Sequence, residues 1–225
     1  MEKTQKRNPK RDQAKVDAKR HELSTKFAQW SSEILTGKRV VVDQSQLLWG
    51  DVCGYVWGKT SQRIEVPVGN QRKRQTYYGT LDLMTGRVLV IPYKKGDSKY
   101  TIEFLTALQQ HYPDTQLVIR WDTPYTRGTC GATYHRSDVV KTYLANVNHD
   151  LSSDKWKITC IRLAPNAPDQ NPIEDVWRQA KRLVRKSYHK CIAFSDVKNV
   201  FNQPIENVSF RFDKLSQYQN LLHPV

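Results

Sequence analysis

Two short β-branched segments that each end in an aspartate most constrain the fold of this chain. Residues 39–42 read R-V-V-V and precede Asp43, and residues 117–121 read L-V-I-R-W and precede Asp122. Short apolar runs of this kind favour strands that are buried on both faces of a sheet. In open α/β sheets, sites form beyond the carboxyl ends of the strands. The sequence therefore predicts two buried strands whose aspartates contribute to one site.

The remaining segments predict how these strands are connected. Strand-like runs with Gly and Asn at their turns follow the first aspartate, at residues 54–58, 63–67, 75–82 and 87–92. Helical patterns occur at residues 100–112, 136–151 (with Ser137 as a cap) and 194–201, and a further core strand at residues 157–163. Three strands followed by alternating helices and strands match an α/β fold, a ribonuclease-H-like mixed five-stranded sheet with helices on both faces.

Residues 164–186 contain the most clearly marked helix start in the chain. Asn171 suits the N-cap, Pro172 the first helical position and Glu174 the third, where its carboxylate can reach back to the cap. Apolar side chains recur at helical spacing: Ile173, Val176, Trp177, Ala180, Leu183 and Val184. A different side carries Glu174 followed by basic residues: Arg178, Lys181, Arg182 and Arg185. Glu174 is therefore either a capping carboxylate or the acid of a site.

The letters of residues 164–177, A-P-N-A-P-D-Q-N-P-I-E-D-V-W, resemble the motif around the third catalytic acid of Tc/mariner-type DDE transposases. The pattern in the bacterial insertion-sequence branch of that family, a DDE superfamily endonuclease domain, is roughly P-x-S-P-x-x-N-P-I-E-x-x-W, with the glutamate as a metal ligand. Ala167 stands in place of the usual serine. The resemblance covers residues 38–200 and implies that Asp43 and Asp122 are the catalytic aspartates that act with Glu174. Gln44 stands where a glutamate commonly follows the first aspartate.

Three clustered carboxylates suit phosphodiester chemistry. Mg²⁺ binds carboxylate and water oxygens and keeps several waters, so two ions can share three carboxylates and a substrate phosphate. Such ions activate the attacking oxygen and stabilise the leaving oxygen. Without metal, the three acids would raise one another's pKa values. Asp43, Asp122 and Glu174 are therefore the candidate catalytic residues and the candidate ligands of Mg²⁺ or Mn²⁺, with two ions expected.

The segment after Asp122 departs from the family pattern. In relatives the second aspartate runs almost directly into a sequence like G-A-T-Y-H-R at residues 131–136, whereas residues 123–130 intervene here. The Pro and Gly of this insertion and its lack of apolar periodicity favour an exposed loop. The insertion is either a harmless surface loop or one that impairs catalysis. His135 is either a contact to phosphate or metal-bound water, or a hydrogen-bonded residue at a helix start.

The overall charge indicates a polyanionic partner. The chain carries a formal net charge of +14, which favours nucleic acid. Residues 1–36 are strongly basic and partly helical in pattern, so they are either a linker arm that lies on DNA phosphates or a solvated tail. Residues 37–225 are expected to form the catalytic domain. The basic residues that follow Glu174 on its helix, together with His135, are the DNA-binding candidates.

The resemblance also implies partners. We expect double-stranded DNA (element ends and target) as the substrate, a homodimer on that DNA, and a separate N-terminal helix-turn-helix half for which this chain has no room. Four cysteines without a C-x-x-C pair disfavour zinc and favour reduced thiols, as expected for a cytoplasmic, nucleoid-associated bacterial protein. No apolar run approaches transmembrane length, so no membrane association is expected.

These observations predict the catalytic domain of a metal-dependent DDE transposase, which performs DNA strand cleavage and strand transfer at insertion-element ends. Two alternatives stay open: a catalytically decayed, DNA-binding transposase remnant, and a nuclease of the same fold without strand transfer. Trp49, Trp57 and Trp177 are expected to be core aromatics rather than platforms for stacked bases. Asp82 and Asp97 are expected to be turn formers.

Overall fold

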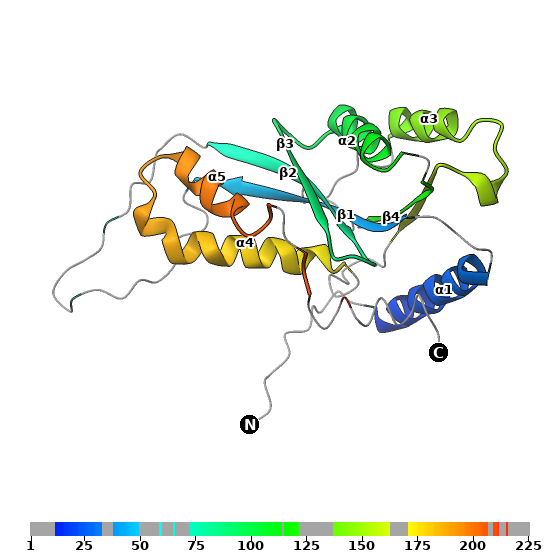
Figure 1. The fold of residues 1–225 in the computed structure, drawn as a ribbon, viewed down its shortest axis with the longest axis horizontal. Helices are drawn as coiled ribbons and strands as arrows, with labels where there is room; N and C mark the ends of the chain where they lie inside the picture. The colour runs from blue at the N-terminus through cyan, green and yellow to red at the C-terminus, as the bar shows by residue number, and fades with distance from the viewer. Residues whose placement is uncertain are drawn as a thin grey trace, which may run out of the picture.

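A mixed β-sheet with helices on both faces forms the centre of the protein (Figure 1). The computed structural model describes residues 12–32, 38–49, 59, 65, 73–113, 115–121, 137–162, 171–206, 209–211 and 215. The strands are β1 (Lys38–Leu48), β2 (Arg74–Asp82), β3 (Val88–Tyr93), β4 (Leu117–Trp121) and β5 (Ile158–Arg162). The α-helices are α1 (Gln13–Ser32), α2 (Ser98–His111), α3 (Asp138–Val147), α4 (Ile173–Ser187) and α5 (Phe194–Asn202).

The sheet has the strand order β3-β2-β1-β4-β5. β1 is antiparallel to β2 and β2 to β3, whereas β1 and β5 both run parallel to β4. The predicted ribonuclease-H-like, mixed five-stranded sheet of the α/β class is therefore confirmed. The strand-like run at residues 54–58 lies outside the described residues. Of residues 63–67 only Glu65 is described, and it lies outside any strand.

Side chains of β1 alternate between two separate cores, one on each face of the sheet. Val41 and Leu47 belong to the core that α4 and α5 cover, whereas Val40 and Val42 belong to the core beneath α2 and α3. Because both faces of β1 are covered, apolar residues follow one another here instead of alternating with polar ones. The core on the α4 side also includes residues from beyond α5: Ile205, Phe210 and Leu215.

β1 is longer than the sequence predicts, and Asp43 lies within it rather than at its end. Its parallel pairing with β4 stops at the Val41–Arg120 pair, but its antiparallel pairing with β2 continues to Leu48. Ser45 and Leu47 are buried, so the inward alternation continues past the aspartate and keeps the strand on the core. Asp43 therefore lies just beyond the point where β1 loses its parallel neighbour.

The start of α4 also differs from the prediction by one residue. The helix begins at Ile173, and Pro172, itself in a helical conformation (φ −64°, ψ −20°), occupies the N-cap without a side-chain cap. The Asn171 backbone carbonyl accepts the Glu174 N–H at 3.1 Å. The Asn171 side-chain amide is fully buried and has no hydrogen-bond partner among the described residues. Because a buried amide does not cap the helix, Asn171 contributes through its backbone alone.

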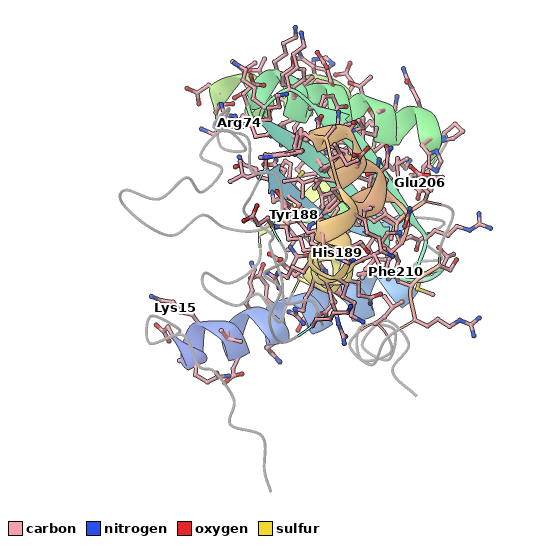
Figure 2. All side chains as sticks on the ribbon, turned by 90° about the vertical axis from the view of Figure 1, so that its left-hand side faces the viewer. Lys15, Arg74, Tyr188, His189, Glu206 and Phe210 are labelled. Atoms are coloured by element: carbon pink, nitrogen blue, oxygen red, sulfur yellow. The ribbon has the colours of Figure 1, made fainter. Side chains whose placement is uncertain are left out.

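Aromatic contacts fix the far end of α4, where Tyr188 follows the helix (Figure 2). Tyr188, directly after the helix, is buried, and its ring lies edge-on to that of Trp49 with centroids 6.4 Å apart. The Trp49 ring in turn meets Phe194 at the start of α5, at 5.8 Å. Trp49 is thus a core aromatic, as the sequence predicts, and it ties the end of β1 to the helix pair α4–α5.

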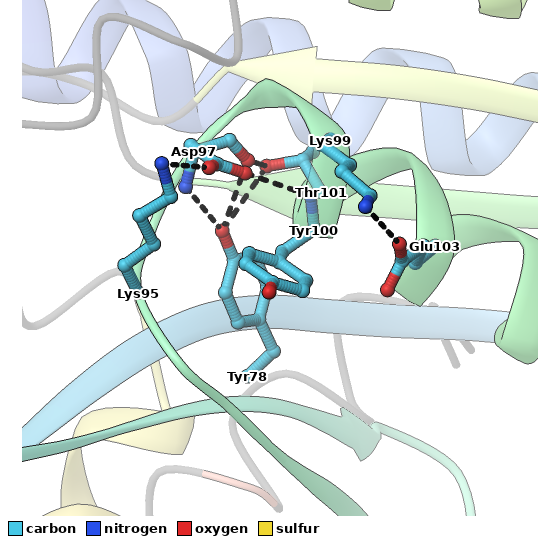
Figure 3. Close-up of polar contacts among 7 residues, drawn as sticks. All are labelled: Tyr78, Lys95, Asp97, Lys99, Tyr100, Thr101 and Glu103. Carbon is cyan, nitrogen blue, oxygen red and sulfur yellow. Dashed lines mark hydrogen bonds and ion pairs between the residues drawn. The ribbon is translucent and has the colours of Figure 1, made fainter.

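Asp97 is the N-cap residue of α2 (Figure 3). The sequence predicts only a turn at this residue. Its carboxylate accepts the Tyr100 N–H at 2.9 Å and pairs with Lys95 Nζ at 3.0 Å. The Tyr78 hydroxyl accepts the Asp97 N–H at 3.2 Å, which joins the cap to β2. Burial alone would raise the pKa of Asp97, but the Tyr100 N–H and the Lys95 charge outweigh it and hold that pKa below its usual value.

The start of α3 is fixed next to the start of α2. Ser137 is the N-cap of α3, as predicted, and its hydroxyl also accepts a hydrogen bond of 2.8 Å from the Ser98 hydroxyl in the first turn of α2.

Asp82 at the end of β2 is a turn former, as predicted, because its carboxylate accepts hydrogen bonds from the backbone N–H groups of Met84 and Thr85.

α1 supplies the helix that the pattern of the basic N-terminal segment predicts. It lies at one end of the molecule, outside the helices that cover the sheet (Figure 1). Two of its lysines are already paired, Lys15 with Asp12 at 3.3 Å and Lys19 with Glu22 at 2.6 Å. Within the described part of the chain, no helix is both long enough and apolar enough to span a bilayer.

Candidate active site

The side chain of Asp43 lies on the face of the sheet that α4 covers. Its half-buried carboxylate accepts a hydrogen bond from the indole of Trp177, with Nε1 3.1 Å from Oδ2. Since Asp43 belongs to β1 and Trp177 to α4, this bond joins two elements that are far apart in the sequence. The bond also fixes which oxygen of the carboxylate is turned toward the indole.

Glu174 lies in the first turn of α4, three positions before Trp177. Residues with this spacing are neighbours on a helix surface, with Cβ atoms about 5–6 Å apart. Glu174 is therefore one helical turn from the contact between Trp177 and Asp43. Its half-buried carboxylate makes no hydrogen bond or ion pair to any other described residue, so the predicted capping box does not form. Acidic side chains are common in the first turn of a helix, where the backbone N–H groups point outward.

The indole of Trp177 lies directly over Gly79, the residue of β2 that pairs with Asp43. A Cβ atom on Gly79 would be 2.3 Å from Cη2 of the indole, so only glycine leaves room for the ring. On α5, the Phe201 ring stacks near the indole with centroids 6.2 Å apart and planes inclined by 14°. Tyr77 stacks on Phe201 at 4.7 Å, and burial, with a smaller effect of the Glu206 charge, raises the pKa of Tyr77 to about 12. The ring assembly is thus neutral and closely packed.

Trp177 is a core aromatic, as predicted, but its contact with Asp43 was missed. Two signals in the sequence could have indicated it. Trp177 follows Glu174 by three positions, and an isolated glycine inside a strand pattern, here Gly79, marks a close approach to the backbone.

The other predicted site residues cannot be placed in the same way. Asp122 and His135 both lie outside the described residues, as do residues 123–130. Among the described residues, no three His, Cys, Asp or Glu side chains gather at one point. Of the three predicted acids, the structure therefore describes Asp43 and Glu174, and Trp177 of the helix that carries Glu174 contacts Asp43.

The basic residues of α4 lie along its exposed side. Arg178, Arg182 and Arg185 are exposed and Lys181 is half-buried, while the opposite side of the helix is buried in the core. Arg178 forms an ion pair with Asp175 in the first turn. The helix thus separates an apolar side, which packs on the sheet, from a basic side that begins next to Glu174.

Comparisons with known proteins identify the family and the fold. The model of the DDE superfamily endonuclease family matches residues 38–194, which extend from β1 to the start of α5. The chain therefore belongs to the DDE superfamily endonuclease family, as the motif predicts. Among proteins with curated descriptions, none matches this sequence.

Solved structures of a transposase share the fold. The Mos1 transposase paired-end complex with the left transposon end matches with a TM-score of 0.62 at 11% identity, over 99% of this chain and 63% of that chain. The mariner Mos1 paired-end complex with Mg gives a TM-score of 0.60 at 11% identity, over 99% and 66%. The Mos1 catalytic domain gives 0.53 at 8% identity, over 95% and 94%. The chain thus spans less than two thirds of the transposase in the first of these complexes and nearly all of the isolated catalytic domain.

A substitution at Gly79 tests the packing of the indole. Gly79→Ala is expected to lower the free energy of unfolding by about 1–3 kcal/mol, the usual cost of overpacking a filled core. The matched control is Thr80→Val, the next residue of β2: its buried hydroxyl has no hydrogen-bond partner among the described residues, so its loss is expected to be neutral or stabilising. Chemical denaturation measures both variants. Equal stability of the two would show that the indole does not lie against Gly79.

Proposed function

We propose that this chain is the catalytic domain of a transposase that cleaves DNA at the ends of an insertion element and joins the freed 3′-hydroxyl groups to target DNA. The observation that carries the proposal is the family match across β1 to α4, together with the hydrogen bond that joins Asp43 to Trp177 on the helix that carries Glu174. A place in the bacterial insertion-sequence branch, as the Ala164–Trp177 motif suggests, forms part of the proposal. So does the division into a basic arm at residues 1–36 and a catalytic domain at residues 37–225.

The donor groups present suit a hard divalent cation. Asp43 offers carboxylate oxygens beside Trp177, and Glu174 offers them in the first turn of the same helix; Mg²⁺ and Mn²⁺ prefer such oxygen ligands. We propose that Asp43, Asp122 and Glu174 hold the metal. When bound, two divalent ions supply charge stabilisation at the attacking and leaving oxygens of the phosphodiester. A Mos1 complex that shares the fold was solved with Mg, which supports this choice of cofactor.

The sheet register supports the inclusion of Asp122. Val41 of β1 pairs with Arg120 of β4, and these two strands are parallel. Asp43 comes two positions after Val41, and Asp122 comes two positions after Arg120. Asp122 is thus proposed as the ligand that approaches Asp43 from the neighbouring strand.

Double-stranded DNA is the proposed substrate. The basic residues of α4 (Arg178, Lys181, Arg182 and Arg185) begin beside Glu174 on the helix, and three of them are exposed, so they suit phosphates of DNA held at the site. A Mos1 complex of the same fold was solved with the left transposon end, which supports DNA as the ligand. His135 and the arm at residues 1–36 are proposed as further phosphate contacts. We also propose a homodimer on the DNA and a separate helix-turn-helix half.

Replacing Glu174 tests the catalytic assignment. Glu174→Gln is expected to lower Mg²⁺-dependent nicking more than about 100-fold, because loss of a mere outer-shell partner of a metal already costs about 10–100-fold. The matched control is Asp175→Asn, which removes the neighbouring carboxylate and its ion pair with Arg178 and is expected to keep nicking within a few-fold. The substrate is a plasmid that carries the genomic DNA flanking the gene, analysed for nicked and joined products.

The outcomes separate the candidate functions. Equal loss in the two variants would contradict the assignment of Glu174. Nicking without joined products would favour a nuclease of the same fold. DNA binding without nicking by the unaltered protein would favour a decayed transposase, in which residues 123–130 impair the site.

Salt dependence tests the DNA-binding assignment. Each phosphate contact contributes about 0.9 log unit of affinity per log unit of salt. The double variant Lys181→Ala/Arg185→Ala is therefore expected to flatten the slope by about 1.8 if both residues contact phosphates. The control, Lys99→Ala/Lys141→Ala, removes the same charge from α2 and α3 on the opposite face, where both lysines pair with carboxylates. Fluorescence anisotropy across a salt series measures the slopes, and equal slopes in the two double variants would contradict the assignment.

A further inference from the structure

We propose that Trp177 is a positioning residue that orients the carboxylate of Asp43 for metal binding and sets its separation from Glu174. This inference rests on the proposed function, because it concerns how the proposed ligands are held. The family match gives no role to Trp177, which is an aromatic side chain of the core.

The first argument is the hydrogen bond itself. The indole Nε1 donates to Oδ2 of Asp43 at 3.1 Å. An indole N–H is a donor only, so the direction of this hydrogen bond is fixed, from Trp177 to Asp43. A donor on one oxygen restricts rotation of the carboxylate about its terminal torsion, which is otherwise broad.

The second argument is that the indole cannot move away from Asp43. Its side chain is 2% exposed. Gly79 lies beneath the ring at a distance that excludes even a Cβ atom, and Phe201 lies parallel to the ring on the α5 side. A donor held by packing on two sides is rigid, and its orientation passes to the group that it binds.

The third argument is the position of Glu174 on the same helix. Glu174 and Trp177 are three positions apart in α4, which corresponds to a rise of about 4.5 Å along the helix axis. Fixing the indole against Asp43 therefore also fixes the helix turn that carries Glu174. Catalytic ligands must be held to within about 0.5 Å, and one contact here constrains two of the three proposed ligands.

Trp177→Phe tests this role because it keeps an aromatic ring over Gly79 and removes the donor. Binding of Mn²⁺ to the protein without DNA, followed by electron paramagnetic resonance, is expected to weaken about 10–100-fold, as for other outer-shell partners of metals. In cleavage assays, the half-saturating Mn²⁺ concentration should rise by a similar factor, while the rate at saturating metal stays within a few-fold. A purely structural role would not separate these two quantities.

The control is Phe104→Leu, which loosens the core on the opposite face of the sheet without touching Trp177. It is expected to lower thermal stability and leave Mn²⁺ affinity unchanged. Equal Mn²⁺ affinity in Trp177→Phe and the unaltered protein would overturn the inference, and so would an equal loss of affinity in Phe104→Leu. The variant Asp43→Asn distinguishes a failure of this inference from a failure of the proposed function. If Asp43→Asn binds Mn²⁺ as well as the unaltered protein, the proposed function fails together with this inference.

Discussion

The hydrogen bond from Trp177 to Asp43 joins the two elements on which the candidate site depends. It forms because α4 lies close against β1 and β2, and this approach is possible because β2 carries glycine at position 79. Beyond this contact, the same helix buries Val176, Ala180 and Val184 in the core. The position of Glu174 thus follows from the packing of the whole helix rather than from a cap at its first turn.

Charge is distributed along α4 in the order that the helix dipole favours. Glu174 and Asp175 lie in the first turn and Arg185 and Lys186 in the last. Each such placement contributes about 0.3–1 kcal/mol at an exposed helix end. The same order sets Glu174 where a cation would bind and the basic residues along the path of a polyanion. One amphipathic helix therefore serves stability, metal binding and DNA binding in the proposed function.

The sequence predicts the five strands of the sheet, the succession of strands and helices along the chain and the helices covering the sheet, because apolar periodicity reflects burial directly, but it also predicts a strand at residues 63–67, where Glu65 lies outside any strand. It does not predict that β1 continues past Asp43, because Gln44, Ser45 and Gln46 look like a turn; pairing with β2 satisfies their backbone instead. Short-range patterns also misplace the start of α4, where Pro172 takes the cap position. Contacts such as Phe210 N–H to the Gly86 carbonyl, at 2.8 Å, join segments without periodicity and leave no local signal. The contact of Trp177 with Asp43 has only indirect signals in the sequence, because it also depends on Gly79 of β2.

Anomalous diffraction from crystals grown with Mn²⁺ tests the central claim most directly, that Asp43, Asp122 and Glu174 form one metal site supported by Trp177. The account predicts a manganese peak about 2.1 Å from carboxylate oxygens of these acids, with the indole still bound to Oδ2 of Asp43. A second peak is expected about 4 Å from the first. A manganese peak bound only by other residues, or an Asp122 carboxylate more than about 10 Å from the other two acids, would contradict it.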